Sequence, residues 1–276
     1  MTYRSMLVAL DALPANPARI NIAIALARQF EAHLIGLAPI PTLDLQTLQA
    51  AAMDDYVARA SATMQAQAHD IAQHFHARCE AAALPSFEAL VDKAPVAESL
   101  TSRAQCTDLL VMSQPDPSLP GHKQQLAELE EVLLDCSRPV LLVPYTHLEP
   151  LRLRRVLLAW DGSRESVRAM TDALPLLRRA EAVTLMHWRG EADDQRPLER
   201  LAGLRQWLAF QGVDAEVRDE VTPLSVGDAL LNAASDHGAD LIVMGAYGHA
   251  RWTERLFGGV SRTLLQSMTV PVLMSH

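Results

Sequence analysis

Cysteine is scarce in this sequence, with three residues among 276, at positions 79, 106 and 136. Their number is odd, none has the CxxC spacing, and no paired histidines lie nearby, so the pattern favours neither a disulfide framework nor a zinc site. We therefore expect Cys79, Cys106 and Cys136 to be small core residues in a reducing, cytosolic protein.

Long apolar runs, aromatic residues and positive charge are also in short supply. The apolar runs, such as residues 5–10, are much shorter than the roughly 18–20 residues of a membrane helix, and Asp11 comes before a signal-peptide core could form. Aromatic residues make up 5 % of the chain and the net charge is −9, which opposes binding to nucleic acid or to anionic lipid. We expect no nucleic-acid partner and no membrane association.

An internal repeat is the strongest feature that is present. Three pairs of segments match: 4–11 with 154–161, 107–113 with 239–245, and 138–143 with 270–275. The first pair is offset by 150 residues and the other two by 132, so the second copy is 18 residues shorter in its middle. The short polar stretch 145–150 suits a linker. The repeat predicts two domains, residues 1–145 and 151–276.

Short Val/Ile/Leu-rich runs alternate with longer stretches of helical period in each copy, which is typical of βαβ units around a parallel sheet. In the second copy we expect strands over 155–160, 182–187, 214–218, 240–245 and 271–274. We expect a helix over 163–179 with Ser163 as its N-cap, and in the first copy a long helix that starts near Leu45 or Leu48. The predicted fold class is α/β, with two doubly wound, Rossmann-like parallel sheets of five strands in tandem.

A group of glycines follows the first and fourth strands of the second copy. Ligands of doubly wound sheets usually bind past the carboxyl ends of these strands. Gly245 and Gly248 are followed, after nine residues, by Gly258 and Gly259 at the start of the last helix. Glycine lets the backbone approach an anion, and the N–H groups of a helix start favour phosphate. Three basic residues lie in or beside this loop: Arg251, Arg255 and Arg262. The segment therefore predicts a polyphosphate site.

With the run Gly245-Ala246-Tyr247-Gly248 through Gly258-Gly259-Val260-Ser261, the sequence resembles tandem members of the universal stress protein family. The resemblance covers essentially the whole chain and implies that the protein binds ATP or another adenine nucleotide. Whether Mg²⁺ accompanies the nucleotide is left open. It implies that Asp161 contacts the ribose or adenine side and that Ala159 and Trp188 line the base pocket. It places the remaining residues at the nucleotide border or its phosphates: Met244, Gly245, Gly248, Gly258, Gly259, Val260 and Ser261. Arg251, a basic residue of the same loop, is a further candidate for the phosphates. Gly259 departs from the family pattern, which has serine or threonine there.

Ordinary structural roles are open for several of these residues. Asp161 could cap the following helix, the glycines could form plain turns, and Trp188 could be core. The arginines could form a solvated face. His187, His237 and His249 show no metal-ligand spacing and are interpreted as structural or surface residues.

The first copy has lost the phosphate features. At the offset of 132, the six site positions carry Ser113, Asp116, Leu126, Ala127, Leu129 and Glu130. Residues 1–150 hold 9 Lys and Arg against 17 Asp and Glu, whereas residues 151–276 hold 15 against 16. The acidic first half should repel an anion, so we predict a degenerate partner domain.

The leading hypothesis is a cytosolic stress-response protein that binds ATP in its second domain and acts as a nucleotide-dependent sensor or interaction module. The alternatives are a slow ATPase or nucleotidyl transferase and a nucleotide-free scaffold. No Walker P-loop is present, and only Glu254 and His249 near the loop could accept a proton, so turnover should be slow or absent. We also expect Gly245→Val or Gly248→Val to abolish nucleotide binding with little loss of fold.

The last strand of each copy, residues 140–143 and 272–274, is apolar and by family resemblance lies at a sheet edge. An open edge favours pairing with another strand. We predict that the two strands pair about a pseudo-two-fold axis within one chain. Whole chains could also form a homodimer, and an unknown protein partner is a further open possibility.

Overall fold

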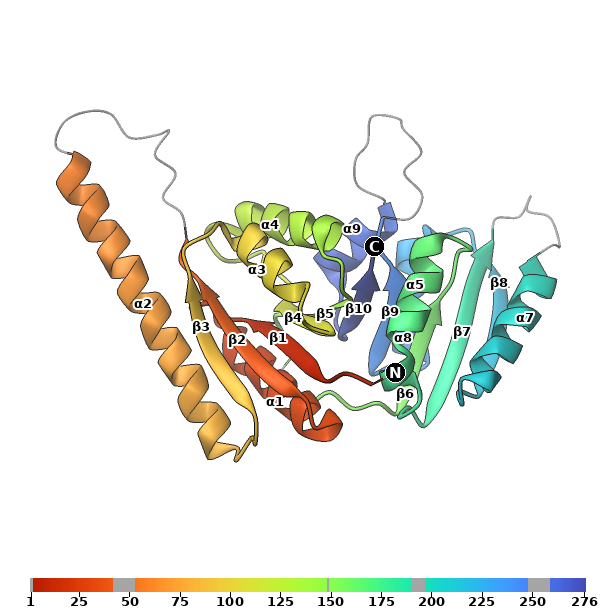
Figure 1. Ribbon diagram of the computed structural model, residues 1–276. Helices are drawn as coiled ribbons and strands as arrows, with labels where there is room; N and C mark the ends of the chain where they lie inside the picture. The colour runs from red at the N-terminus through yellow and green to blue at the C-terminus, as the bar shows by residue number, and fades with distance from the viewer. Residues whose placement is uncertain (1, 42–52, 148, 190–196, 248–258) are drawn as a thin grey trace.

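Two halves of similar element order follow one another in the computed structural model (Figure 1). It describes residues 2–41, 53–147, 149–189, 197–247 and 259–276. The N-terminal half contains β1 (Ser5–Ala9), α1 (Asn16–Phe30), β2 (His33–Pro39), α2 (Met53–Ala81), β3 (Phe87–Asp92), α3 (Val96–Ala104), β4 (Leu109–Ser113), α4 (His122–Asp135) and β5 (Val140–Val143). The C-terminal half contains β6 (Arg155–Ala159), α5 (Arg164–Asp172), α6 (Leu174–Leu177), β7 (Ala182–Arg189), α7 (Pro197–Phe210), β8 (Ala215–Val221), α8 (Val226–Asp236), β9 (Leu241–Gly245), α9 (Gly259–Ser267) and β10 (Val272–Ser275).

All ten strands form one sheet in the order β3-β2-β1-β4-β5-β10-β9-β6-β7-β8. Pairing is parallel within each half, and β5 and β10 join the halves in an antiparallel pair. In this pair Leu273 lies opposite Leu141, its equivalent at the offset of 132. A pseudo-two-fold axis therefore passes through the pair, as predicted from the two terminal strands.

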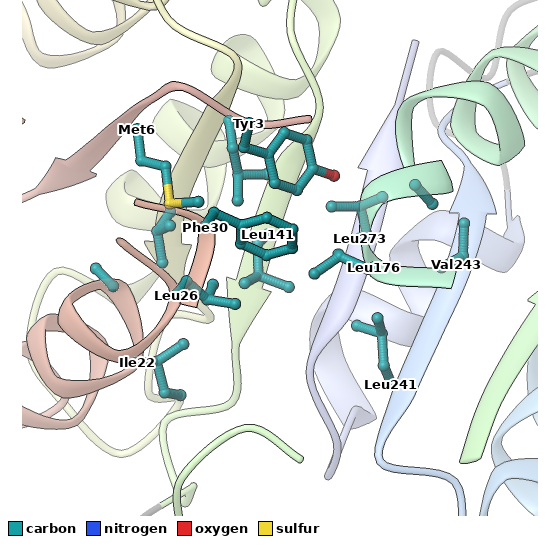
Figure 2. Close-up of a cluster of buried hydrophobic side chains, with 14 of the residues drawn as sticks. Tyr3, Met6, Ile22, Leu26, Phe30, Leu141, Leu176, Leu241, Val243 and Leu273 are labelled. Carbon is teal, nitrogen blue, oxygen red and sulfur yellow. The ribbon is translucent and has the colours of Figure 1, made fainter. Parts of the chain in front are cut away.

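Helices cover both faces of the sheet, which is why its central strands are buried along their length. One core layer contains buried residues of α1, α2, α5, α6 and α7, and the other contains buried residues of α3, α4, α8 and α9. The first layer is continuous across the two halves. Figure 2 shows side chains from both halves meeting there, among them Tyr3, Phe30, Leu141, Leu176 and Leu273. Tyr3 also donates a hydrogen bond to the Asp172 carbonyl oxygen, at 2.8 Å.

The repeat keeps its framework contacts at the amino end of the sheet. Asp108 accepts hydrogen bonds from the backbone N–H groups of Arg4 and Ser5. Its equivalent Asp240 accepts from those of Arg154 and Arg155. One sequence pattern thus builds the same link between the first and fourth strands twice.

Most elements expected from the sequence are present, and two expectations differ from the structure. Each expected strand of the second copy overlaps an observed one, and Ser163 caps α5 by accepting from the Ser166 N–H at 3.1 Å. The single helix expected over 163–179 is instead divided into α5 and α6, with Pro175 in the first turn of α6. The expected start of the long first-copy helix lies outside the described residues. Cys106 is exposed, so its prediction as a core residue is wrong, whereas Cys79 and Cys136 are buried.

Candidate functional site

A cavity of about 380 Å³ lies at the carboxyl ends of β6 and β9, where the sequence placed the ligand. Eight predicted residues line it: Ala159, Asp161, Trp188, Met244, Gly245, Gly259, Val260 and Ser261. These residues come from segments up to about a hundred positions apart, brought together because parallel strands present their carboxyl ends at one edge. The other predicted residues, Gly248, Arg251 and Gly258, lie outside the described residues, as do His249, Glu254 and Arg255.

The structure adds lining residues that the sequence analysis missed: Trp160, Ser166, His187, Val226, Leu230 and Tyr247. Trp160 follows the predicted Ala159 of β6, and His187 precedes the predicted Trp188 of β7. Their position at the ends of these strands is the sequence feature that could have identified them. Val226 and Leu230 belong to α8, and no motif marks them. The interpretation of His187 as only structural or surface is incomplete, because this side chain lines the cavity.

His187 is held in place by an acidic partner behind it. Its Nδ1 lies 2.8 Å from Asp219 Oδ1, and Arg189 Nε donates to Asp219 Oδ2 at 3.0 Å. The His187 ring lies 5.5 Å from the Trp160 ring, centroid to centroid. Because a carboxylate only accepts hydrogen bonds, His187 carries a proton on Nδ1, and in its neutral form Nε2 is the acceptor. The cavity wall therefore offers a fixed imidazole beside an indole.

Asp161 forms a turn before α5. Its Oδ1 accepts from the Ser163 N–H at 2.9 Å and from the Ser163 hydroxyl at 2.6 Å. The equivalent Asp11 accepts from the Leu13 N–H in the same way. The structure thus shows a turn role for this aspartate in both halves. The carboxylate by itself does not distinguish a nucleotide site.

Gly245 is required by packing. A Cβ at this position would lie 2.6 Å from the Ser166 backbone nitrogen and 2.7 Å from the Glu165 carbonyl carbon. Such contacts are too short for real atoms, so a side chain would push α5 away from β9. The expectation that Gly245→Val spares the fold is therefore wrong.

Ser261 and Gly259 differ in what surrounds them. The Ser261 side chain is 3 % exposed, and its Oγ accepts from the Tyr247 N–H at 3.2 Å. Tyr247 has a left-handed backbone, with φ of 57°, so this bond holds an unfavourable turn at the end of β9. A Cβ on Gly259 would meet no atom of the described residues within 4 Å. As far as the described residues define it, position 259 has room for the hydroxyl side chain that it lacks.

Arg262 is the equivalent of Glu130 at the offset of 132. Burial raises the pKa of the Glu130 carboxyl, and the charge of Arg262 partly offsets this rise. Opposite charges therefore occupy the two equivalent positions, on α4 and α9.

A second cavity, of about 350 Å³, lies at the carboxyl ends of β1 and β4 in the N-terminal half. Arg19 of α1 lines it and is 2 % exposed. Its guanidinium donates to Asp11, Asn16 and Ser113 at 2.8, 2.9 and 2.9 Å, respectively. At the offset of 150, the C-terminal equivalent of Arg19 is the fully buried Ala169. The two cavities therefore have the same place in the repeat and different chemistry.

Comparison with known proteins identifies the C-terminal half. Residues 152–276 match the family model described as the universal stress protein family. Universal stress protein Slr1230 of Synechocystis sp. is 24 % identical over 148 residues, which are 53 % of this chain and 50 % of that protein. The chain thus spans about half the length of this relative.

Solved structures share the fold over nearly the whole chain. A universal stress protein from Archaeoglobus fulgidus covers 98 % of this chain and 95 % of its own, with a TM-score of 0.72 and 19 % identity. A functionally unknown protein from Pseudomonas aeruginosa PAO1 covers 99 % and 92 %, with a TM-score of 0.59 and 14 % identity. Among the described helices, none is long and apolar enough to cross a bilayer. Residues 152–276 therefore form a domain of the universal stress protein family, and the N-terminal half repeats the same strand order.

Proposed function

We propose that the C-terminal cavity binds ATP or another adenine nucleotide, and that the protein acts in a stress response as a nucleotide-dependent sensor or interaction module. The carrying observation is that eight residues predicted for this ligand line one cavity at the carboxyl ends of β6 and β9. In this proposal residues 1–145 and 151–276 are the two domains, and only the second holds the nucleotide.

The walls of the cavity suit a nucleobase at one end. Trp188, Met244 and Leu230 supply apolar surface, which favours burial of a flat aromatic ring. A neutral His187 with its acceptor on Nε2 can receive a hydrogen bond from an exocyclic amine, the group that adenine carries and hypoxanthine lacks. These features favour adenine over hypoxanthine.

The start of α9 suits the phosphates. Gly259 and Val260 open the helix at the cavity, where backbone N–H groups without helical partners and the helix dipole attract anions. Asp161 is the single carboxylate among the described lining residues. One carboxylate is a poor metal site by itself, so we expect Mg²⁺ to enter the cavity already bound to the phosphates of the nucleotide. The expectation of slow or absent hydrolysis stays a prediction, as do the cytosolic location and dimerisation of whole chains.

A pair of equivalent substitutions tests the proposal. Ala159 and Ala9 end the first strand of their halves and line the two cavities. Ala159→Leu adds bulk to the proposed base pocket and should weaken ATP binding more than tenfold in calorimetry, while Ala9→Leu should leave it unchanged. ATP should also bind more tightly than ITP. Absence of heat with every adenine nucleotide at millimolar concentration, or equal loss from both variants, would contradict the proposal.

A further inference from the structure

The N-terminal cavity contains charges that disfavour phosphate. Asp11, Asp116 and Glu128 line it, against a single described cation, Arg19. Both Nη atoms of Arg19 already donate to Asp11, Asn16 and Ser113. Because Arg19 pairs with Asp11, an anion entering here would meet the carboxylates of Asp116 and Glu128 with no second described cation in the lining to offset their repulsion. The cavity therefore favours uncharged or positively charged molecules.

Two buried acceptors in this cavity have no hydrogen-bond donor among the described residues. The Gln114 side chain is 2 % exposed, and its Nε2 donates to the Leu265 carbonyl oxygen at 3.0 Å. That bond fixes which end of the amide is oxygen, and Oε1 is buried without a partner in the described chain. Gln125 is half-buried, and its Oε1 atom is also buried without a partner in the described chain. A buried acceptor without a donor costs roughly 1–3 kcal/mol, so a ligand that donates hydrogen bonds here would recover that cost.

The rest of the lining is mainly apolar. Ala9, Leu100, Met112 and Leu129 come from the central strands and from the two helices on that face, α3 and α4. The volume of about 350 Å³ is within the range of small-molecule sites. Apolar walls with a few unsatisfied polar groups are the usual composition of such sites.

We propose that the N-terminal cavity is a second ligand site, which takes an uncharged or cationic small molecule with an aromatic or aliphatic body and N–H or O–H donors. The donors would meet the oxygens of Gln114 and Gln125, and the body would lie against Met112 and its apolar neighbours. This site is independent of the nucleotide proposed for the C-terminal half. The half that has lost the phosphate features would then be a receptor for different chemistry.

Two methionines at equivalent positions allow the sites to be followed separately. Met112 lines the N-terminal cavity and Met244 the C-terminal one. In full-length protein with ¹³C-labelled methionine methyl groups, Met112→Leu and Met244→Leu identify the two signals. The probes are tryptamine, tryptophol and indole-3-acetate, which share an indole ring and are cationic, neutral and anionic, respectively.

We expect tryptamine and tryptophol to shift the Met112 signal with saturation and to bind at least tenfold more tightly than indole-3-acetate. Gln125→Met removes one acceptor at similar length and should weaken tryptamine binding about tenfold. Ala9→Leu should abolish the Met112 shift, and Ala159→Leu should not. A Met244 signal unchanged in position in the Ala9→Leu variant would show that this variant is folded.

Three results would overturn the proposal. One is an unmoved Met112 signal with every probe at millimolar concentration. Another is equal affinity for the three probes, which would indicate simple partitioning into an apolar space. The third is unchanged tryptamine affinity in Gln125→Met, which would remove the role of the buried acceptor. None of these results depends on whether ATP binds the C-terminal half.

Discussion

The two halves share a strand order and an aspartate turn, and they differ in how the first helix meets the fourth strand. In the C-terminal half, Gly245 lets the backbone of α5 pack directly on the end of β9. In the N-terminal half, Ser113 stands at that position and the buried Arg19 bonds to it from α1. The equivalent of Arg19 is Ala169. A close-packed interior therefore offers two solutions here, a glycine against the α5 backbone or a serine bonded to a buried arginine.

Two distant positions of the repeat therefore differ between the halves. A serine at position 245 would overpack the contact with α5. An alanine at position 19 would leave a cavity beneath Ser113 and would leave Asp11 without its cation. Replacements at either position should therefore have different effects in the two halves.

The largest expected effect comes from Gly245→Val. The added atoms have no room beside the Ser166 and Glu165 backbone, so we expect the free energy of unfolding to fall by about 3 kcal/mol. Ser113→Val, its matched control, loses only the hydrogen bond from Arg19 and should cost about 1 kcal/mol. Urea denaturation of both variants measures this difference. Equal losses would mean that the α5 contact does not account for the glycine.

Arg19→Met should have the next largest effect, about 2 kcal/mol. It removes three hydrogen bonds and leaves Asp11 without its cation, although the 35 % exposure of the Asp11 side chain lets water offset part of the cost. Asp11→Asn in the Arg19→Met background should recover part of the stability, a coupling that a double-mutant cycle measures. Strictly additive losses would show that the ion pair does not stabilise the N-terminal half.

Gly259→Ser sharpens the comparison at the phosphate end of the proposed nucleotide site. The open space at this position accepts the side chain, and its hydroxyl can donate to a phosphate oxygen. We expect ATP affinity to rise three- to tenfold, or about 1 kcal/mol. Ala127→Ser, at the equivalent exposed position of α4, should leave affinity unchanged in the same calorimetric assay. Weaker binding in Gly259→Ser would place the phosphates elsewhere.

The smallest expected effect concerns the pH dependence of stability at Glu130. Burial raises the pKa of Glu130 above its unfolded value, so the folded state holds this proton more tightly. Its contribution to stability is present below the unfolded pKa and is lost as pH rises through the folded pKa. Glu130 therefore makes stability fall as pH rises from 4 to 7, and Glu130→Gln should remove this fall, so that the unfolding free energy at pH 7 minus that at pH 4 is more positive in the variant than in the unmodified protein by a fraction of a kcal/mol. A more negative value in the variant would reverse the sign of the inferred shift.

Much of the site region could be predicted from the sequence. The ends of the first and fourth strands of the second copy placed Asp161 and Gly245 at one edge, the family resemblance added Ala159 and Met244, and all four line one cavity. Local patterns suffice for this, because strand periodicity and parallel connectivity determine which residues reach the carboxyl edge.

The details that distinguish the halves needed the tertiary structure. The contact that explains Gly245 joins residues about 80 positions apart, and the bond from Arg19 to Ser113 spans 94. The orientation of the Gln114 amide, and so the position of its buried oxygen, depends on a hydrogen bond to Leu265, which lies 151 residues away in the other half of the chain.

The sequence by itself determined the repeat, the alternation of strands and helices and the edge at which the C-terminal cavity lies, because each follows from short-range pattern or from the comparison of two copies, and the family resemblance added the pairing of the terminal strands. Only the tertiary structure decided why Gly245 is glycine, that Ser261 supports the Tyr247 turn, and that the N-terminal half keeps a cavity with buried acceptors. These features depend on the packing of helices against distant strands. The shape of the space between such elements is set by side chains that no local pattern brings together.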